Sequence, residues 1–323
     1  MWQIITLYVA FVIVLGCVSY ILMFRPRFRS LEFTKQCSLE HGEIDNAFLE
    51  LDWKQWTFSS PHGYALKGQY LCGKEGAPAA LFVHGITWTR YGMGKYMRPF
   101  IELGWNVAAF DLAGHGESSA PRRFYPSFGF YEKFDVEEGV KALRLLFPHA
   151  ACYGLFGESL GAASALEYAS LAGKGASRAV DFIVADCPFS SIWDELMEQY
   201  RSIHVPNFFA WPAGQLLRGL ARLLRGFDIK EAAPIKSVMQ TDMPILFAHG
   251  MDDSYVPTMM SVRMASARMA NNVGVTELVL IPGAKHADGI MTDKARWLAG
   301  VTAFIDRVCS EKNSAHMSGQ RGV

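Results

Sequence analysis

The residue best placed to do chemistry is a serine between two glycines, in the run Gly157-Glu158-Ser159-Leu160-Gly161. The apolar residues 150–156 before it predict a strand, and the small residues 160–171 predict a helix. Glycines permit a sharp turn between strand and helix because they lack a Cβ. The serine hydroxyl would sit at the tip of that turn, and the first N–H of the helix could stabilise a developing oxyanion. Taken alone, the run also fits a chance glycine-rich turn.

The partners that such a serine needs follow later in the chain. A serine hydroxyl becomes a nucleophile when a base takes its proton, and an acid must hold that base in the right tautomer. Residues 249–257, His-Gly-Met-Asp-Asp-Ser-Tyr-Val-Pro, follow a strand predicted at 244–248 and carry two carboxylates. His286 follows the last predicted strand, residues 277–281. Serine, acid and histidine therefore occur in that order along the chain.

In these motifs the chain resembles serine hydrolases of the α/β-hydrolase superfamily, near its S9/S33-peptidase-like and lysophospholipase-like branch. The matching pieces lie in family order between residues 80 and 290. They are His84-Gly85, Asp111 with residues 114–118 (Gly-His-Gly-Glu-Ser), the serine run, residues 249–257 and His286. The resemblance implies an α/β-hydrolase fold with a mostly parallel central sheet, helices on both faces and a helical lid insertion. It also implies catalysis without a cofactor.

The resemblance assigns catalytic roles position by position. Ser159 is the expected nucleophile, His286 the base and Asp253 the acid that orients it. Asp253 holds the aspartate position in the pattern H-G-x-x-D-x-x-V-P. Its neighbour Asp252 is a rival for that role, as is Asp186 at the end of a preceding predicted strand.

The remaining motif residues are expected to shape the site. The backbone N–H groups of Ile86 and Leu160 are the expected oxyanion hole. Four other polar residues are expected to brace their loops through hydrogen bonds rather than to transfer protons: His84, Asp111, His115 and Glu158.

Strand and helix patterns alternate through residues 53–310, the expected hydrolase domain, and such alternation predicts a mostly parallel sheet covered on both faces. Residues 188–240 break this rhythm with prolines and aromatic residues, at the place where the superfamily inserts its lid. Within it, leucines occupy one helical face and Arg218, Arg222 and Arg225 the other. This basic amphipathic helix could touch an anionic membrane. We favour the alternative, a lid helix on its own core with a solvated basic face.

Residues 4–24 carry no charged side chain and are long enough to span a bilayer as a helix. The start, Met1-Trp2-Gln3, lacks the basic residues of a signal peptide. We therefore interpret residues 1–24 as an uncleaved transmembrane anchor, residues 25–52 as a linker and residues 311–323 as a disordered tail. Arg25, Arg27 and Arg29 follow the apolar run, and this flank predicts a catalytic domain in the cytoplasm.

The composition of the chain excludes several other classes of function. Lys+Arg and Asp+Glu both total 31, so no charge bias supports nucleic-acid binding. The six cysteines form no C-x-x-C pair and the nine histidines no H-x-x-x-H pair, so no metal site is predicted. Cys152 and Cys187 fall in predicted buried strands, and we interpret them as small core residues in a reducing compartment.

These inferences together predict a membrane-anchored serine hydrolase that forms an acyl-enzyme on Ser159. The apolar lid favours a carboxylester or a lipid-like acyl ester over a large peptide as substrate. A serine peptidase and a thioesterase share the same triad and stay open as alternatives. A non-catalytic binding protein on this fold is the alternative from another class, and the intact Ser, Asp and His argue against it. The oligomeric state is left open.

Overall fold

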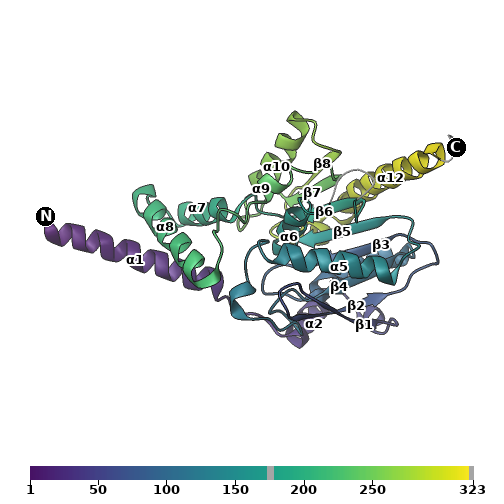
Figure 1. The fold of residues 1–323 in the computed structure, drawn as a ribbon, viewed down its shortest axis with the longest axis horizontal. Coiled ribbons are helices and arrows are strands. Elements are labelled where there is room, and N and C mark those ends of the chain that lie inside the picture. The colour runs from purple at the N-terminus through teal and green to yellow at the C-terminus, as the bar shows by residue number, and fades with distance from the viewer. Residues whose placement is uncertain (173–177, 320–323) are drawn as a thin grey trace.

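The computed structural model describes residues 1–172 and 178–319 of the chain. At its centre lies an eight-stranded sheet with the order β1-β2-β4-β3-β5-β6-β7-β8 (Figure 1). Strands β1 and β2 form an antiparallel hairpin, β2 pairs antiparallel with β4, and all the other neighbours are parallel. The predicted mostly parallel sheet is therefore confirmed. The strands are β1 (Lys54–Ser59), β2 (Ala65–Leu71), β3 (Ala79–Val83), β4 (Asn106–Phe110), β5 (Tyr153–Glu158), β6 (Phe182–Asp186), β7 (Ile245–Gly250) and β8 (Thr276–Ile281).

Helices cover both faces of the sheet, as the apolar strands require. In β3 every residue is buried, and successive side chains point to opposite faces. Leu81 and Val83 belong to the core that also contains buried residues of α5 (Glu132–Leu146), α6 (Leu160–Tyr168) and α10 (Met259–Ala270). Phe82 packs into the other core, with α4 (Gly94–Glu102), α11 (Gly289–Thr292) and α12 (Lys294–Gly319). Two apolar layers thus hold the sheet rigid, with its parallel strands ending along one edge.

The predicted lid segment is helical. It contains α7 (Ile192–Ser202), α8 (Asn207–Arg225) and the short α9 (Pro234–Ser237). Helices α7 and α8 extend away from the sheet, beside the N-terminal helix (Figure 1). Ser191 caps α7 by accepting a hydrogen bond from the N–H of Asp194, and Gly226 ends α8 in the left-handed conformation.

The N-terminal segment begins with the apolar helix α1 (Trp2–Phe24), the one described helix that is long and apolar enough to cross a membrane. The predicted linker holds α2 (Leu31–Glu40) and α3 (Asn46–Leu49), and Ile44 and Phe48 are buried in the same core as Phe82. Two 3₁₀ turns, Arg90–Met93 and Arg122–Phe124, lie in later loops. Helix α12 continues past residue 310 to Gly319, and residues 320–323 of the predicted tail lie outside the described residues.

One cysteine is paired where the sequence indicated a free thiol. Cys152, at the start of β5, forms a disulfide with Cys309 in α12, and their Cα atoms are 6.2 Å apart. The interpretation of Cys152 as a reduced core residue is therefore wrong. The partners are separated by 157 residues in sequence, and only the packing of α12 on the sheet brings them into bonding range. Cys187 is a buried free thiol, as expected.

Candidate active site

Ser159 stands at the turn between β5 and α6, in a conformation that L-residues seldom adopt (φ 52°, ψ −112°). Close packing on either side requires both glycines of the run. A Cβ on Gly161 would lie 2.0 Å from the carbonyl oxygen of Val83, and one on Gly157 would lie 2.5 Å from the nitrogen of Ala162. The predicted strand, sharp turn and helix are all present, and the turn holds the hydroxyl at the carboxyl edge of the sheet.

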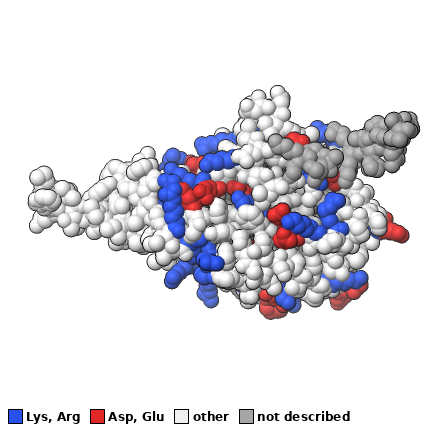
Figure 2. Space-filling model, viewed as in Figure 1, with Lys and Arg blue, Asp and Glu red and all other residues white. Residues whose placement is uncertain are grey.

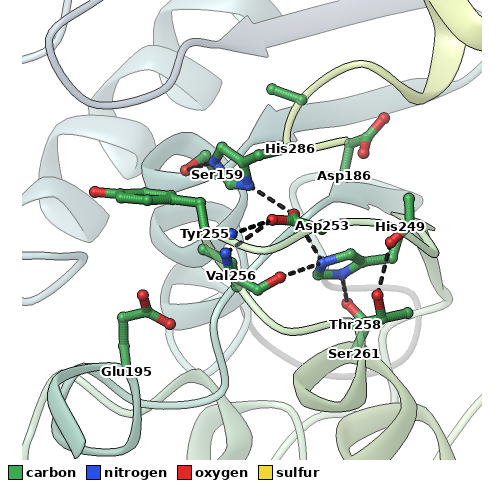
Figure 3. A network of polar contacts seen from close by, with 12 residues as sticks. Ser159, Asp186, Glu195, His249, Asp253, Tyr255, Val256, Thr258, Ser261 and His286 are labelled. Carbon is green, nitrogen blue, oxygen red and sulfur yellow. Dashed lines mark hydrogen bonds and ion pairs between the residues drawn. The ribbon is translucent and has the colours of Figure 1, made fainter. Parts of the chain in front are cut away.

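The three residues predicted as a triad meet at this edge (Figure 3). The Oγ of Ser159 lies 3.0 Å from Nε2 of His286, and Nδ1 of the same imidazole lies 2.7 Å from Oδ2 of Asp253. Asp253 follows β7 and His286 follows β8, so parallel strands deliver all three from one side. The Asp253 side chain is fully buried and that of His286 is 21% exposed. A proton can pass from the serine to the imidazole, and the carboxylate can stabilise the resulting charge.

Asp253 is held by more groups than the sequence indicated. Its Oδ1 accepts hydrogen bonds from the N–H groups of Tyr255 and Val256, both 2.9 Å long. Its Oδ2 also contacts Nε2 of His249 at 3.1 Å. Burial acts to raise the pKa of Asp253, but hydrogen bonds from His249 and His286 and the charge of His286 outweigh it and hold that pKa well below its usual value. The carboxylate therefore stays ionised across physiological pH.

Neither rival aspartate contacts His286. Asp252 is exposed, and its backbone N–H donates to the carbonyl of Ala284. Asp186 is buried beneath the site, where its Oδ2 accepts hydrogen bonds from the Tyr96 hydroxyl at 3.1 Å and from the Trp297 indole at 2.8 Å. Asp186 thus ties α4 and α12 to the end of β6.

The two expected oxyanion donors face one cavity. Leu160 is the first residue of α6, and Ile86 lies in the loop after β3. Within the described part of the chain, the N–H groups of both residues have no hydrogen-bond acceptor. A Cβ on the neighbouring Gly85 would lie 3.4 Å from Cβ of Ser159, so the loop runs directly beside the serine. Both N–H groups are available to a negatively charged oxygen.

Buried polar residues brace that loop, as the sequence predicted. His84 accepts a hydrogen bond from the N–H of Leu112, and His115 accepts one from the N–H of Thr87. Burial lowers the pKa of His84 to about 4 and also lowers the pKa of His115 well below its usual value, so both rings stay neutral. Asp111 is paired with the guanidinium of Arg90 and accepts the Arg90 N–H as well. These residues fix the position of Ile86 and do not reach Ser159.

A buried ion pair under the site was not predicted. Nζ of Lys95 lies 2.8 Å from a carboxylate oxygen of Glu158, the residue before the serine. The same ammonium donates to the carbonyl of Ala287 at 2.7 Å and contacts Glu43 at 3.4 Å. Lys95 therefore joins the serine turn to the loop that carries His286. Sequence offered no signal, because Lys95 lies on the outer helix α4, far from either segment along the chain.

The triad opens into a cavity of about 970 Å³. Its walls are largely apolar and come from the sheet edge, the lid and α1; they include Leu22, Met23, Phe128, Phe189, Ile192 and Leu196. Four acidic residues also line it, Glu43, Glu158, Glu195 and Asp288, and of these Glu195 belongs to the lid helix α7. Oε1 of Glu195 accepts a hydrogen bond from Gln199 at 2.8 Å, and its buried Oε2 has no hydrogen-bond partner among the described residues. Burial raises the pKa of Glu195 to about 7. In Figure 3 this carboxyl stands apart from the triad.

Cys187 is the third member of a cluster whose donor atoms, with those of Asp253 and His286, lie within 4.8 Å of one another. Such a cluster can suggest a metal. Here the aspartate and the histidine already hydrogen-bond to each other, and burial raises the pKa of the Cys187 thiol well above its usual value. Metals bind the thiolate, so this donor set does not fit a metal ion.

Two protein families match the chain. Residues 78–224 match the family described as alpha/beta hydrolase fold, and residues 218–312 match the prolyl oligopeptidase family. The uncharacterized protein YqkD of Bacillus subtilis strain 168 is 28% identical over 298 residues, covering 92% of this chain and 94% of that protein.

Solved structures with the same arrangement include an esterase and a peptidase. The Pyrococcus furiosus esterase Pf2001 superposes with a TM-score of 0.61 at 22% identity, over 82% of this chain and 95% of the esterase. The acylaminoacyl peptidase of Pyrococcus horikoshii superposes with a TM-score of 0.60 at 16% identity, over 81% of this chain and 43% of the peptidase.

Proposed function

This chain is a serine hydrolase with the α/β-hydrolase fold, and we propose that it cleaves carboxylic esters with an apolar acyl chain. The observation that supports this most directly is the opening of the Ser159–His286–Asp253 cluster into an apolar cavity. Ser159 attacks the ester carbonyl while His286 takes its proton. The N–H groups of Ile86 and Leu160 stabilise the oxyanion of the tetrahedral intermediate.

The proton then leaves with the product. His286 gives it to the departing alcohol oxygen, and an acyl-enzyme remains on Ser159. Water, activated by the same imidazole, attacks the acyl-enzyme and releases the acid. Asp253 keeps the Nδ1 proton on the imidazole throughout and stabilises the imidazolium.

An ester fits the cavity better than a peptide does. A bound peptide backbone presents an N–H and a C=O at every residue, and burying these groups without partners is costly. The walls formed by α1 and the lid offer mostly hydrocarbon, which an acyl chain fills without that cost. A peptidase and a thioesterase are the competing activities, since both proceed through the same acyl-enzyme.

A substrate screen tests the proposal. The full-length protein is assayed with p-nitrophenyl esters of increasing chain length, an acyl thioester and an aminoacyl amide, and Ser159→Ala is the control. We expect fluorophosphonate labelling at Ser159 and the highest kcat/KM for a medium or long acyl ester. Turnover of the amide above that of every ester would instead identify a peptidase.

We further propose that α1 attaches the enzyme to a membrane as a single-pass anchor. The helix carries no charged residue and is about 35 Å long, against about 30 Å for a bilayer core. The Arg25–Arg29 flank supports a cytoplasmic catalytic domain. The Cys152–Cys309 bond opposes that side, since disulfides persist mainly in oxidising compartments. Protease protection of intact cells distinguishes a cytoplasmic catalytic domain from one on the outside.

A further inference from the structure

Helix α1 packs along the lid helix α8. Gly16, Tyr20 and Phe24, at helical spacing, are the buried residues of α1. A Cβ on Gly16 would lie 2.9 Å from the carbonyl oxygen of Ala213 in α8, so the two backbones are in close contact there. Nearer the N-terminus, the ring of Phe209 stacks on Tyr8 at 5.3 Å. The contact between the helices therefore continues for most of the length of α1.

Hydrogen bonds fasten the other end of α1 to the lid. The guanidinium of Arg225, at the end of α8, donates to the carbonyl of Phe24 at 2.7 Å and to the Tyr20 hydroxyl at 3.1 Å. The hydroxyl of Tyr200 in α7 donates to Oγ of Ser19 at 2.8 Å. A helix that served only as a tether would need none of these contacts.

The same end of α1 forms a wall of the substrate cavity. Ser19, Leu22 and Met23 line it together with α7. Leu22 is 71% exposed and Ile203 of the lid is 66% exposed, although both line the cavity. Residues that face both the cavity and the outside mark an opening, and on this side the opening is apolar. His41 at the end of α2 and Lys285 in the loop after β8 are exposed lining residues, so another part of the border is polar.

The charged residues of α1 and α8 are distributed as a helix pair inserted in a bilayer requires. They run parallel, since Tyr8 lies beside Phe209 and Phe24 beside Arg225. Helix α8 has no charged residue before Arg218, and the arginines after α1 lie at that same end. Figure 2 shows an uncharged projection, with basic side chains where it meets the body. Apolar residues outward and the exposed Arg25, Arg27 and Arg29 inward match hydrocarbon and anionic headgroups. The arginines of α8 are engaged within the protein, since Arg218 and Arg222 pair with Asp228 and Arg225 is buried. Helix α7 carries four charged residues along its length, Asp194, Glu195, Glu198 and Arg201, so α1 and α8 are the helices whose outer parts are apolar enough to face lipid.

We infer that α1 and α8 form one membrane-embedded unit that admits substrate from the bilayer, so that the natural substrate is an acyl ester resident in lipid. The acyl chain passes the Leu22–Ile203 opening to reach Ser159, and its polar alcohol lies toward His41 and Lys285. This inference rests on the proposed esterase function and assigns its substrate class. It gives α1 a role in substrate access in addition to attachment.

The test separates access from attachment with one substitution and its control. Gly16→Leu keeps α1 apolar but inserts a side chain where Ala213 and Leu216 leave no room, so α1 must move away from α8. Val18→Leu makes a similar change at an exposed position of the same helix. Full-length proteins are reconstituted in vesicles of phosphatidylcholine with phosphatidylglycerol. Hydrolysis is measured for 4-methylumbelliferyl oleate in the vesicles and for soluble 4-methylumbelliferyl acetate.

We expect Gly16→Leu to stay in the membrane fraction and to lose about tenfold in oleate rate, while acetate hydrolysis and fluorophosphonate labelling stay near wild type. Val18→Leu should match wild type on both esters. An oleate rate for Gly16→Leu equal to wild type would refute the inference. A wild type that labels but hydrolyses neither ester would instead refute the proposed esterase function.

If Gly16→Leu also loses labelling through misfolding, a second pair of variants tests whether the substrate enters through the Leu22–Ile203 opening. Leu22→Trp narrows the opening itself, and Ile21→Trp places the same indole at an exposed position of α1 that does not line the cavity. A lower oleate rate for Leu22→Trp than for Ile21→Trp supports the inference. Equal oleate rates for the two variants overturn it.

Discussion

Replacing Asp253 by asparagine should disable the enzyme through the tautomer of His286. Oδ1 of Asp253 accepts from two backbone N–H groups, so the amide oxygen of an asparagine must take that position. Its NH₂ group then occupies the position of Oδ2 and points at Nδ1 of His286. An amide donor there requires a bare Nδ1, which leaves the proton on Nε2. Nε2, the nitrogen that faces Ser159, then has no lone pair to take the serine proton.

The expected loss of kcat is large because the substitution removes both the correct tautomer of His286 and the negative charge that stabilises its imidazolium. The equivalent substitution in a Ser-His-Asp protease lowers kcat about 10⁴-fold, which corresponds to about 5 kcal/mol of transition-state stabilisation. Steady-state kinetics on a p-nitrophenyl ester measures the loss, and thermal unfolding checks the fold. Asp252→Asn is the matched control, since Asp252 is exposed and does not contact His286. A drop of less than about tenfold for Asp253→Asn, or a larger drop for Asp252→Asn, would refute the tautomer argument.

Three further outcomes are expected. Ser159→Ala should lower turnover about 10⁶-fold and abolish fluorophosphonate labelling with an unchanged melting temperature; retained turnover would exclude Ser159 as the nucleophile. Glu195 titrates near 4.5 when unfolded and near 7 when folded, so the unfolded state binds fewer protons between these values and stability falls as pH rises. Glu195→Gln should remove up to about 3 kcal/mol of that fall, as urea unfolding at pH 5 and pH 8 would show, and an unchanged pH dependence would contradict the burial argument. A C-terminal tag should survive protease treatment of intact cells, because the Arg25–Arg29 flank predicts a cytoplasmic domain; a digested tag would place the domain outside, the side that the Cys152–Cys309 disulfide favours.

Much of the scaffold could be predicted because its signals are local. Strands β7 and β8 begin within one residue of the strands predicted at 244–248 and 277–281, since continuous apolar runs between polar segments have few alternatives in a parallel sheet. The sharp turn that carries the serine could also be predicted, because the turn is only a few residues long and needs both Gly157 and Gly161. Spacing alone placed Asp253 and His286 after consecutive strands, and parallel strands end at one edge.

Contacts between distant segments were decided only by the tertiary structure. Asp186 ends β6 and Asp253 follows β7, and the packing of the loops determines that Asp253, rather than Asp186, meets the imidazole. Lys95 reaches Glu158 from an outer helix, and Cys152 reaches Cys309 across the chain, at distances that no local pattern encodes. The apolar residues of α1 indicated a preference for lipid, but its docking on α8 depends on which faces fit together. A sequence states which side chains prefer burial, whereas only the folded chain shows which surfaces bury one another.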